Sequence, residues 1–412
     1  HIKFKNMSLN YKSQNLLINN TSIKKVVRGN PTPFYLYSYE KIRNNFKNFS
    51  NYFKKVDPLI CFSVKSNSNV FIISELGKLG SGADVVSKGE LMKALKAKIK
   101  PNRIVFSGVG KTESELLHAI KKKVLLINIE SESEAILINK LSKKLNCITN
   151  IGIRINPGVD AKTISKITTG KLDSKFGLIK SDFLKFCKNS KKYKNIKIKA
   201  ISVHIGSQIT SIGPYKKTLD FLLKTIKSCR ISFEFVDLGG GFGIPYNKRE
   251  KIIDIKNYAK LVENFKSKLD CKIIFEPGRF IIGNTGTLIS KVVFVKKSGK
   301  KYFIIIDAGM NDFMRPALYN AKHEIIPVLK SKKRINGDVE FVGPICESSD
   351  TFLKYKNFTS VSEGSLVAIT NVGAYGSTLS SNYNTRPLAA EIIIKKGQIK
   401  VIRKRQKISE II

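Results

Sequence analysis

Strand-like and helix-like segments alternate along the chain from about residue 35 to residue 279. The apolar segments that favour β-strands include RIVFSG (103–108), LLINIES (125–131), NIGIRINPG (150–158), IKAISVHIGSQ (198–208), SFEFVDLGGGFG (232–243) and CKIIFEPGR (271–279). Segments of helical periodicity separate them, and one begins with Thr112 as the expected N-cap and Glu115 at the capping-box position. About eight such units predict an α/β fold, a (β/α)8 barrel. On the pattern alone, a doubly wound open sheet is the alternative.

The pattern changes after Arg279, where short strand-like segments with glycine turns replace the alternation. Segments such as GDVEFVGPIC, GSLVAITNVG and AEIIIKKGQIKVIRKR predict a mostly antiparallel β-domain, either a sandwich or a Greek-key barrel. The N-terminal residues are also strand-like and are expected to join this domain. We therefore expect an N-terminal strand segment at 1–30, a barrel at 31–280 and a C-terminal β-domain at 281–412.

The composition narrows the range of partners. The chain of 412 residues has a formal net charge of +43, but its lysines are spread along the whole length, so nucleic-acid binding is not expected as a main role. No apolar run approaches the ~18 residues that a membrane helix needs. The six cysteines are scattered without metal-ligand spacing, which favours reduced thiols. We expect a cytoplasmic protein with no metal, no nucleic-acid partner and no membrane partner.

Four short motifs stand at the carboxyl ends of expected barrel strands, where barrels build their active sites. They are CFSVKSN (61–67), HIGSQ (204–208), GGGFG (239–243) and EPGR (276–279). Lys65 follows an apolar strand, and an amine in an apolar wall is biased toward its neutral, nucleophilic form. Taken singly, each motif also has a structural explanation: a lysine among many, a hydrogen-bonded core histidine, or a flexible glycine turn.

Together the motifs meet the demands of pyridoxal phosphate (PLP), which needs an amine, a phosphate cradle and a carboxylate for its ring nitrogen. The glycines let backbone N–H groups approach an anion closely, and Ser207 can add a hydroxyl. Glu276 is the candidate carboxylate, and His204 can lie flat on the ring. The glycine run does not fit a dinucleotide fingerprint, because Ile244 stands where the third glycine belongs.

The ordered set SVKSN, HIGSQ, GGGFG, EPGR, DAGMNDFMRPALY, CESSD and GAYG resembles the diaminopimelate decarboxylase family. These are fold-type III PLP enzymes related to the ornithine and arginine decarboxylases and to alanine racemase. The resemblance covers essentially the whole chain. It implies PLP-dependent decarboxylation of meso-2,6-diaminopimelate to L-lysine and CO2, the last step of lysine biosynthesis. It also implies a homodimer whose active sites are completed across the dimer interface.

The resemblance assigns roles by position. Lys65 would hold PLP covalently, and Cys346 of the partner subunit would be the proton donor. The implied cofactor-binding residues are Lys65, Asp84, Arg154, His204, Ser207, Gly239, Gly240, Gly241, Glu276, Pro277, Gly278, Arg279 and Tyr375. The implied substrate-binding residues are Arg279, Arg315, Tyr319, Glu347 and Tyr375. Two positions, Ser349 and Lys88, carry other residues where the family more often has glycine, which puts loop geometry there in question.

The distal end of the substrate separates the related activities. Diaminopimelate ends in a carboxylate and an ammonium, which suit a guanidinium and an acid such as Arg315 and Glu347. A surface position or an ordinary ion pair is the alternative for Arg315. A decarboxylase of ornithine, arginine or lysine, an amino-acid racemase and a non-catalytic PLP-binding protein remain the alternative functions. The last class lacks the β-domain and the CESSD segment.

Overall fold

The computed structural model describes residues 9–161, 169–170, 174–229, 231–247 and 250–412. Residues 1–8 of the expected N-terminal segment lie outside this part. The chain forms two compact units. The first, the barrel unit, comprises Phe46–Ile244 and Lys251–Phe280, and the second, the β-unit, comprises His1–Asn45, Pro245–Glu250 and Ile281–Ile412.

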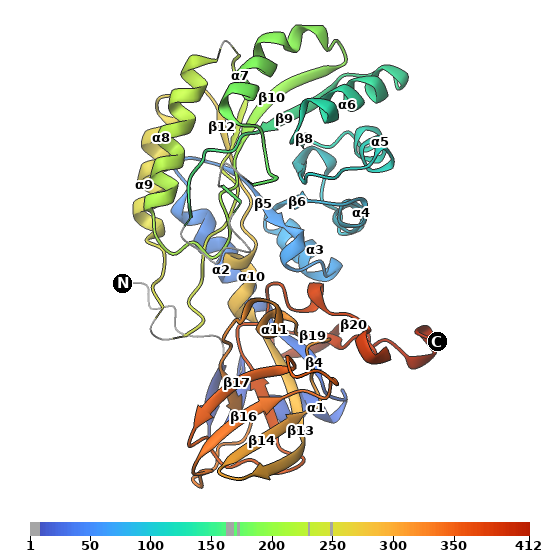
Figure 1. Ribbon diagram of the computed structural model, residues 1–412, viewed down its shortest axis with the longest axis vertical. Coiled ribbons are helices and arrows are strands. Elements are labelled where there is room, and N and C mark those ends of the chain that lie inside the picture. Colours follow the sequence, from blue (N-terminus) through green and yellow to red (C-terminus); the bar gives the residue numbers. More distant parts are fainter. Residues whose placement is uncertain (1–8, 162–168, 171–173, 230, 248–249) are drawn as a thin grey trace. The chain divides into compact units, whose positions relative to one another are not determined.

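Within the described residues of the barrel unit, eight parallel strands close into a barrel, in which β12 pairs with β5 and β9 with β10 (Figure 1). The strands are β5 (Leu59–Ser63), β6 (Gly82–Val85), β7 (Ile104–Phe106), β8 (Leu126–Ile129), β9 (Thr149–Arg154), β10 (Ile196–Ser202), β11 (Phe235–Asp237) and β12 (Lys272–Phe275). The expected (β/α)8 barrel is confirmed, and the open sheet is excluded. Strand ends that are far apart in the sequence are therefore neighbours.

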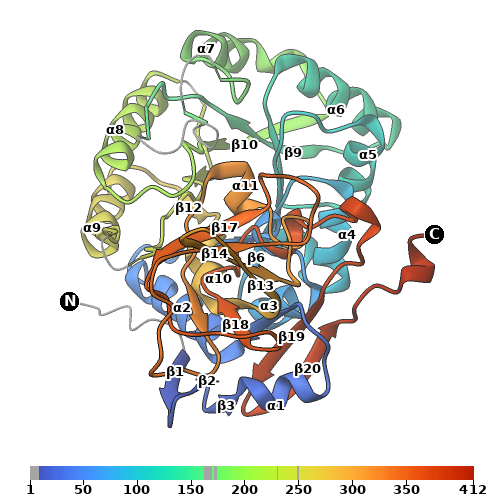
Figure 2. The same ribbon diagram turned by 60° about the horizontal axis from the view of Figure 1, so that its bottom comes forward.

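Helices surround the barrel in chain order (Figure 2). They are α2 (Tyr39–Tyr52), α3 (Val70–Lys78), α4 (Lys88–Lys96), α5 (Glu113–Lys122), α6 (Glu132–Lys144), α7 (Lys180–Asn189), α8 (Gly213–Ser228) and α9 (Ile255–Lys266). The short helix α10 (Arg279–Ile282) follows β12 and is not part of this ring. At the start of α5, Thr112 and Glu115 form the predicted capping box, which satisfies two backbone N–H groups of the first turn.

An aromatic cluster packs behind the last two barrel strands and holds the chain segments that follow them. Phe275 ends β12 and contacts Phe53, with ring centroids 4.4 Å apart. Phe242, in the glycine segment, packs against Phe280 and Tyr215. The Tyr215 hydroxyl also donates a hydrogen bond to the Gly240 carbonyl oxygen. Buried aromatic pairs contribute beyond their area, so the glycine segment and the EPGR segment sit on a rigid support.

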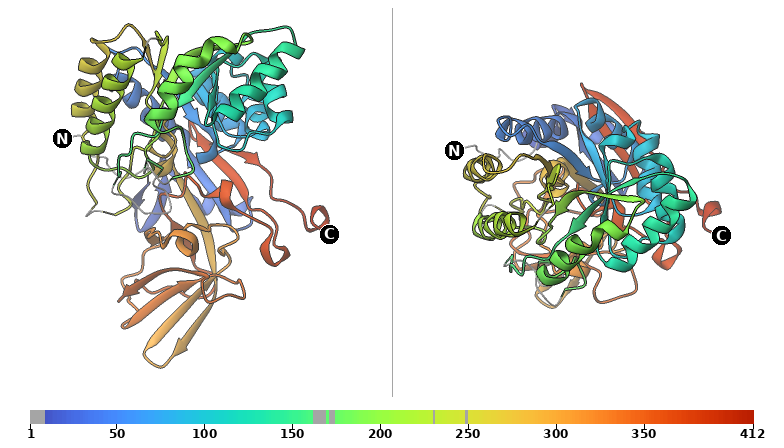
Figure 3. Two further views of the ribbon diagram at one scale, coloured as in Figure 1. Left: turned by 45° about the horizontal axis from the view of Figure 1, so that its top comes forward. Right: turned by 90° about the horizontal axis from the view of Figure 1, so that it is seen from above.

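The β-unit is built on a nine-stranded sheet in which most neighbouring strands are antiparallel. Its strands are β4 (Phe34–Ser38), β13 (Gly286–Ser298), β14 (Lys301–Ile306), β15 (Ile325–Pro327), β16 (Asp338–Val342), β17 (Thr351–Lys356), β18 (Leu366–Ile369), β19 (Ala390–Lys395) and β20 (Gln398–Arg403). The pairs β14–β16 and β4–β19 are parallel, and β4 (blue) and β19 (red) can be followed in Figure 3. The expected mostly antiparallel β-domain is thereby confirmed. A short helix, α11 (Arg315–Tyr319), follows β14.

The N-terminal residues also belong to the β-unit. Strands β1 (Leu9–Lys12), β2 (Asn15–Ile18) and β3 (Thr21–Ser22) form a small sheet of their own, and α1 (Ile23–Arg28) follows them. Leu16 and Ile18 pack into the core of the unit.

The placement of β4 differs from the expected boundary at residue 31. This strand pairs with β13 and β19 instead of entering the barrel. Its residues FYLYS are all buried, as they would be in a barrel strand. A continuous apolar run therefore could not distinguish the two sheets.

Candidate active site

Lys65 lies just beyond the carboxyl end of β5, in the 3-10 turn η1 (Val64–Ser66). Its Nζ atom is 3.4 Å from Oδ2 of Asp84 on the neighbouring strand β6, and the Lys65 side chain is 36% exposed. The Ser63 hydroxyl donates to the same Asp84 oxygen over 2.7 Å. The apolar wall expected around Lys65 is therefore incomplete, because a carboxylate faces the amine. This amine has both solvent access and a fixed partner.

Three buried carboxyl groups interact at this end of the barrel: Asp84, Asp237 at the end of β11 and Glu276 directly after β12. Burial first, and then the charges of Asp237 and Asp84, raise the pKa of Glu276 well above its usual value, while Lys65 lowers it. Among the described residues, Glu276 Oε1 has no hydrogen-bond partner. A buried carboxyl oxygen without a donor is a site for an incoming N–H group.

His204 and Arg154 lie at the ends of β10 and β9. Arg154 donates to Glu130 Oε1 over 2.8 Å and to the His204 carbonyl oxygen over 3.3 Å. The Gly240 N–H donates to His204 Nδ1 over 3.3 Å. Burial, followed by the charges of Lys65 and Arg154, lowers the pKa of His204 well below its usual value. The imidazole is therefore neutral at pH 7, with its proton on Nε2.

The glycine segment after β11 runs against neighbouring backbone. A Cβ atom on Gly240 would lie 2.1 Å from the Glu276 carbonyl oxygen, and one on Gly241 would lie 2.2 Å from that of Gly206. The φ angles of Gly239 and Gly241 are +65° and +89°, a region that favours glycine. No larger residue fits this path. The glycines thus bring the segment into direct contact with the Glu276 backbone.

The other cofactor residues expected in the barrel unit lie beside this segment. Arg279 donates to the Ser207 hydroxyl over 3.0 Å. The Pro277 carbonyl oxygen accepts a hydrogen bond from the Ser63 N–H. Gly278 passes so close to the η1 turn that a Cβ atom there would meet a side chain 2.9 Å away. The segments that follow β5, β10, β11 and β12 are therefore connected, and the predicted set from Lys65 to Arg279 shares one face of the barrel.

The expected substrate residues Arg315 and Tyr319 belong to the β-unit. Arg315 is buried at the start of α11, and its Nε donates to His323 Nε2 over 3.2 Å. Its guanidinium lies 5.3 Å and 5.8 Å from the ring centroids of Tyr246 and Tyr319. Arg315 is thus an interior residue of this unit, and the surface alternative does not hold. Stacking on two rings fixes a planar guanidinium for two-pronged binding.

Cys346 and Glu347 are exposed in the segment between β16 and β17. The Cys346 N–H donates to Asn384 Oδ1 over 3.3 Å. Glu347 Oε1 accepts from the Tyr383 hydroxyl, and Oε2 accepts from the Ser349 hydroxyl over 2.9 Å. These two hydrogen bonds, that of Tyr383 first, lower the pKa of Glu347. The segment therefore presents an oriented carboxylate and a thiol to solvent.

The backbone φ angle is informative at three further residues, Tyr375, Ser349 and Lys88. Tyr375 is half-buried with φ +55°, which is uncommon for a residue other than glycine and marks a constrained position. Ser349 and Lys88, by contrast, do not have positive φ angles. The two departures from the family's glycines therefore impose no left-handed strain. Lys88 begins α4, and its N–H donates to Glu115.

Several residues of these sites were not among the sequence predictions. Asp237 contacts the glycine segment, Glu130 holds Arg154, His323 contacts Arg315, and Tyr383 binds Glu347. Asp237 and Glu130 do carry a signal, because each stands at the carboxyl end of a barrel strand, and Asp237 also lies next to the glycine motif. His323 and Tyr383 carry none, since only the folded β-unit brings them to their partners.

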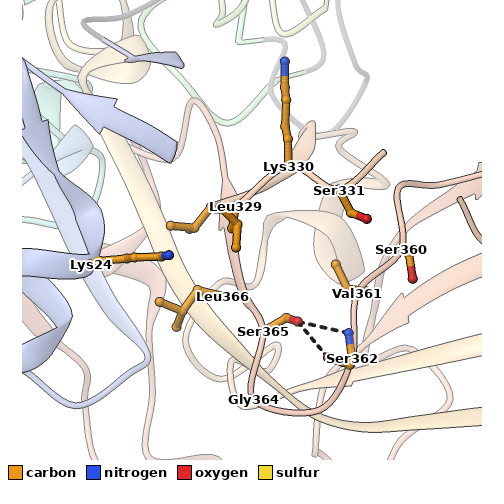
Figure 4. A pocket seen from close by; sticks show the side chains of 11 residues that line it. Lys24, Leu329, Lys330, Ser331, Ser360, Val361, Ser362, Gly364, Ser365 and Leu366 are labelled. Carbon is orange, nitrogen blue, oxygen red and sulfur yellow. Dashed lines mark hydrogen bonds between the residues drawn. The ribbon is translucent and has the colours of Figure 1, made fainter. Parts of the chain in front are cut away.

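The β-unit also contains a cleft of about 410 Å³. Figure 4 shows Lys24 extending toward Leu329 and Leu366, while Ser362 and Ser365 bond to each other. Its lining combines lysines, serines and aliphatic side chains, without a carboxylate, histidine or cysteine. It lacks the carboxyl and imidazole groups that accompany Lys65 on the barrel face, so the barrel face is the candidate active site.

The residues of the barrel face fit PLP. Glu276 has an acceptor oxygen for a ring nitrogen, His204 offers a neutral ring, and Lys65 offers an accessible amine. The glycines pack against neighbouring backbone where a side chain would not fit, and a glycine segment can turn its backbone N–H groups toward an anion.

Comparisons with known proteins point the same way. Residues 39–283 match the family "Pyridoxal-dependent decarboxylase, pyridoxal binding domain". The chain is 42% identical to the diaminopimelate decarboxylase of Aquifex aeolicus over 409 residues, 98% of this chain and 96% of that protein.

Solved structures of diaminopimelate decarboxylases are also similar. The Helicobacter pylori enzyme complexed with L-lysine has a TM-score of 0.90 at 42% identity, covering 94% of this chain and 98% of that one. The M. jannaschii enzyme in complex with L-lysine has a TM-score of 0.91 at 35% identity, covering 98% and 96%. The chain therefore belongs to the pyridoxal-dependent decarboxylases and, within them, to the diaminopimelate decarboxylase family.

Proposed function

We propose that this chain is a PLP-dependent carboxy-lyase that converts meso-2,6-diaminopimelate to L-lysine and CO2. The observation that carries the proposal is the set of groups on one barrel face: Lys65 beside Asp84, neutral His204, and Glu276 against the glycine segment. The resemblance to decarboxylases across nearly the whole chain supports the same reaction.

PLP, when bound, supplies the electron sink that a departing carboxylate needs. Lys65 would bind the cofactor covalently through its amine and give it up to the substrate amine. Glu276 would hold the ring nitrogen protonated, and neutral His204 would lie on the ring without repelling its positive charge. Ser207, the 239–241 glycines and the backbone of 277–279 would hold the phosphate. Asp84 and Arg154 would line the pocket.

The β-unit would supply most of the substrate-binding residues, and Arg279 of the barrel unit would be the exception. We assign the substrate carboxylates to Arg279, Arg315 and Tyr319, with Tyr375 touching both cofactor and substrate. A buried, ring-stacked guanidinium suits fork-like carboxylate binding. Glu347 would bind the distal ammonium, for which its lowered pKa keeps it ionised.

The active form would be a homodimer in which each subunit completes the site of the other. The exposure of Cys346 and Glu347 supports this, because a proton donor and an ammonium-binding acid at the surface of one chain can serve another chain. The partner subunit's Cys346 would return a proton to the carbon that loses CO2.

The proposed setting is the cytoplasm. The described residues include all six cysteines, and none of them is in a disulfide. Among the helices of the described chain, none is both long and apolar enough to cross a membrane.

The test is product formation by the purified, PLP-loaded protein. Incubation with meso-diaminopimelate should release CO2 and L-lysine in equal amounts. Ornithine, arginine and lysine should release little CO2, since each lacks the distal carboxylate that Arg315 would bind. Release of putrescine from ornithine with no turnover of diaminopimelate would refute the proposal.

A further inference from the structure

Asp237 is a carboxylate of the barrel face that accepts three hydrogen bonds. Its Oδ1 accepts the Gly239 N–H over 3.0 Å. Its Oδ2 accepts from Asn128 Nδ2 over 3.1 Å and from the Ser202 hydroxyl over 3.3 Å. The side chain is fully buried. Three donors around one buried carboxylate stabilise its ionised form, because they replace the water it has lost.

Glu276 is the opposite case. It is also buried, yet its Oε1 atom has no hydrogen-bond partner in the described part of the chain. An ionised carboxylate with an unsatisfied oxygen is costly in such a place. Two interacting buried carboxyl groups share one proton, since both cannot ionise cheaply. The distribution of donors therefore assigns the charge to Asp237 and the proton to Glu276.

The neighbouring charges agree with this assignment. Asp84 adds negative potential that raises the pKa of both acids, and Lys65 opposes it at Glu276 while pairing with Asp84. Burial and these neighbours raise the pKa of Asp237 only to about 6, whereas that of Glu276 is raised well above its usual value. Burial first, and then the same cluster of carboxyl groups, raises the pKa of the Cys61 thiol, so it stays neutral.

We infer that Asp237 is a positioning residue for the cofactor: it carries the charge in the unliganded pocket, keeps Glu276 protonated, and holds Gly239 in place. The inference rests on the proposed function. The Glu276 proton is then ready for a ring nitrogen. If a ring nitrogen took this proton, the O–H bond of Glu276 would break, its electron pair would stay on the Glu276 oxygen, and an N–H bond would form. Asp237 thereby couples the ring-binding acid to the glycine segment.

Infrared difference spectroscopy tests the protonation directly. The full-length protein is stripped of PLP, and its spectrum is compared before and after PLP is added. Wild type should lose one neutral-carboxyl band, and Glu276→Gln should lack that band. Burial raises the pKa of Glu90 to about 7, so it can also contribute a neutral-carboxyl band, and Glu276→Gln separates the two because it leaves the Glu90 band in place. In Asp237→Asn the band should disappear at a lower pH, because the charge that holds the proton is gone.

Two outcomes would overturn the assignment. If unliganded wild type shows no neutral-carboxyl band that PLP removes, Glu276 is not protonated. If the band survives Glu276→Gln and vanishes in Asp237→Asn, the proton belongs to Asp237. The double variant Asp237→Asn/Asn128→Asp controls for misfolding of Asp237→Asn. It exchanges the amide and the carboxylate of the hydrogen-bonded pair formed by residues 128 and 237, so that one of each remains. It should lower the pH at which the Glu276 band disappears, as Asp237→Asn does.

Two variants, Asp237→Asn and Asp237→Ala, test the hydrogen bond between Asp237 and the glycine segment. An asparagine at 237 can still accept the Gly239 N–H, whereas an alanine cannot. Asp237→Ala should therefore weaken PLP binding about tenfold more than Asp237→Asn does. Equal dissociation constants would contradict that part of the inference. If wild type binds no PLP at all, the proposed function fails instead, so the two failures are distinguishable.

Discussion

Glu347 is an exposed carboxylate whose two oxygens accept hydroxyl groups of Tyr383 and Ser349. We predict that Tyr383→Phe raises KM for diaminopimelate by about two- to fivefold and that Ser349→Gly raises it less, because exposed charged contacts are individually weak. Steady-state kinetics of the PLP-loaded variants checks this, with PLP affinity as the control. A larger effect of Ser349→Gly, or a loss of PLP, would mean that the hydroxyls do not act through Glu347.

Glu276 should make the unliganded protein less stable as pH rises. Its pKa is raised on folding, so between its unfolded value of about 4.5 and its folded value the native state keeps a proton that the unfolded state loses. The free energy of unfolding should fall by up to about 1.4 kcal/mol per pH unit in this window from this group alone. His204, whose pKa is lowered, acts in the opposite direction below pH about 6.5.

Urea titrations of PLP-free protein between about pH 5 and pH 8 measure this dependence. Glu276→Gln should flatten the fall, because an amide does not ionise. A variant with the same pH dependence as wild type would show that another group dominates.

At the scale of elements, the glycine segment after β11 should tolerate no side chain. We predict that Gly240→Ala lowers the free energy of unfolding by about 1–3 kcal/mol and weakens PLP binding, because the new Cβ atom meets the Glu276 carbonyl oxygen. Gly110→Ala is the matched control, since a Cβ atom there has nothing within 4 Å. Denaturation and PLP titration measure both effects. Equal behaviour of the two variants would contradict the close packing.

The elements themselves were predictable where the signal is local. The capping box of α5 follows from two residues three positions apart, and the motifs at the ends of β5, β10, β11 and β12 follow from runs of apolar residues and glycines. The sheet to which β4 belongs could not be predicted, because a fully buried strand has the same apolar sequence pattern in either sheet. Its neighbours β13 and β19 lie more than 240 residues away in the chain.

The same limit applies to the supporting residues of the site. That Lys65, His204 and Glu276 lie on one barrel face could be predicted, because their motifs each follow an expected barrel strand. Asp237 accepts a hydrogen bond from Asn128, which is 109 residues distant in the sequence, and the bond from Tyr383 to Glu347 spans 36 residues. Tertiary packing brings such partners together, so no local sequence spacing predicts these hydrogen bonds.

At the scale of the whole molecule, the proposed dimer predicts complementation. Lys65→Ala and Cys346→Ala subunits should each be nearly inactive. Unfolded together and refolded, they should recover about a quarter of wild-type activity, because half of the dimers would be mixed and each mixed dimer would have one intact site. Activity no greater than the sum of the separate variants would contradict a site shared between subunits. Sedimentation of each sample confirms that dimers have re-formed.

The most direct test of the barrel face as the catalytic centre is the position of the cofactor's covalent bond. Borohydride reduction of the PLP-loaded protein, followed by peptide mapping, should place the label on Lys65. Lys65→Ala should remove the label while the protein stays folded. The chain offers many exposed lysines as competitors, which makes the result decisive. A label on any other lysine, with Lys65 unmodified, would contradict the assignment of the site.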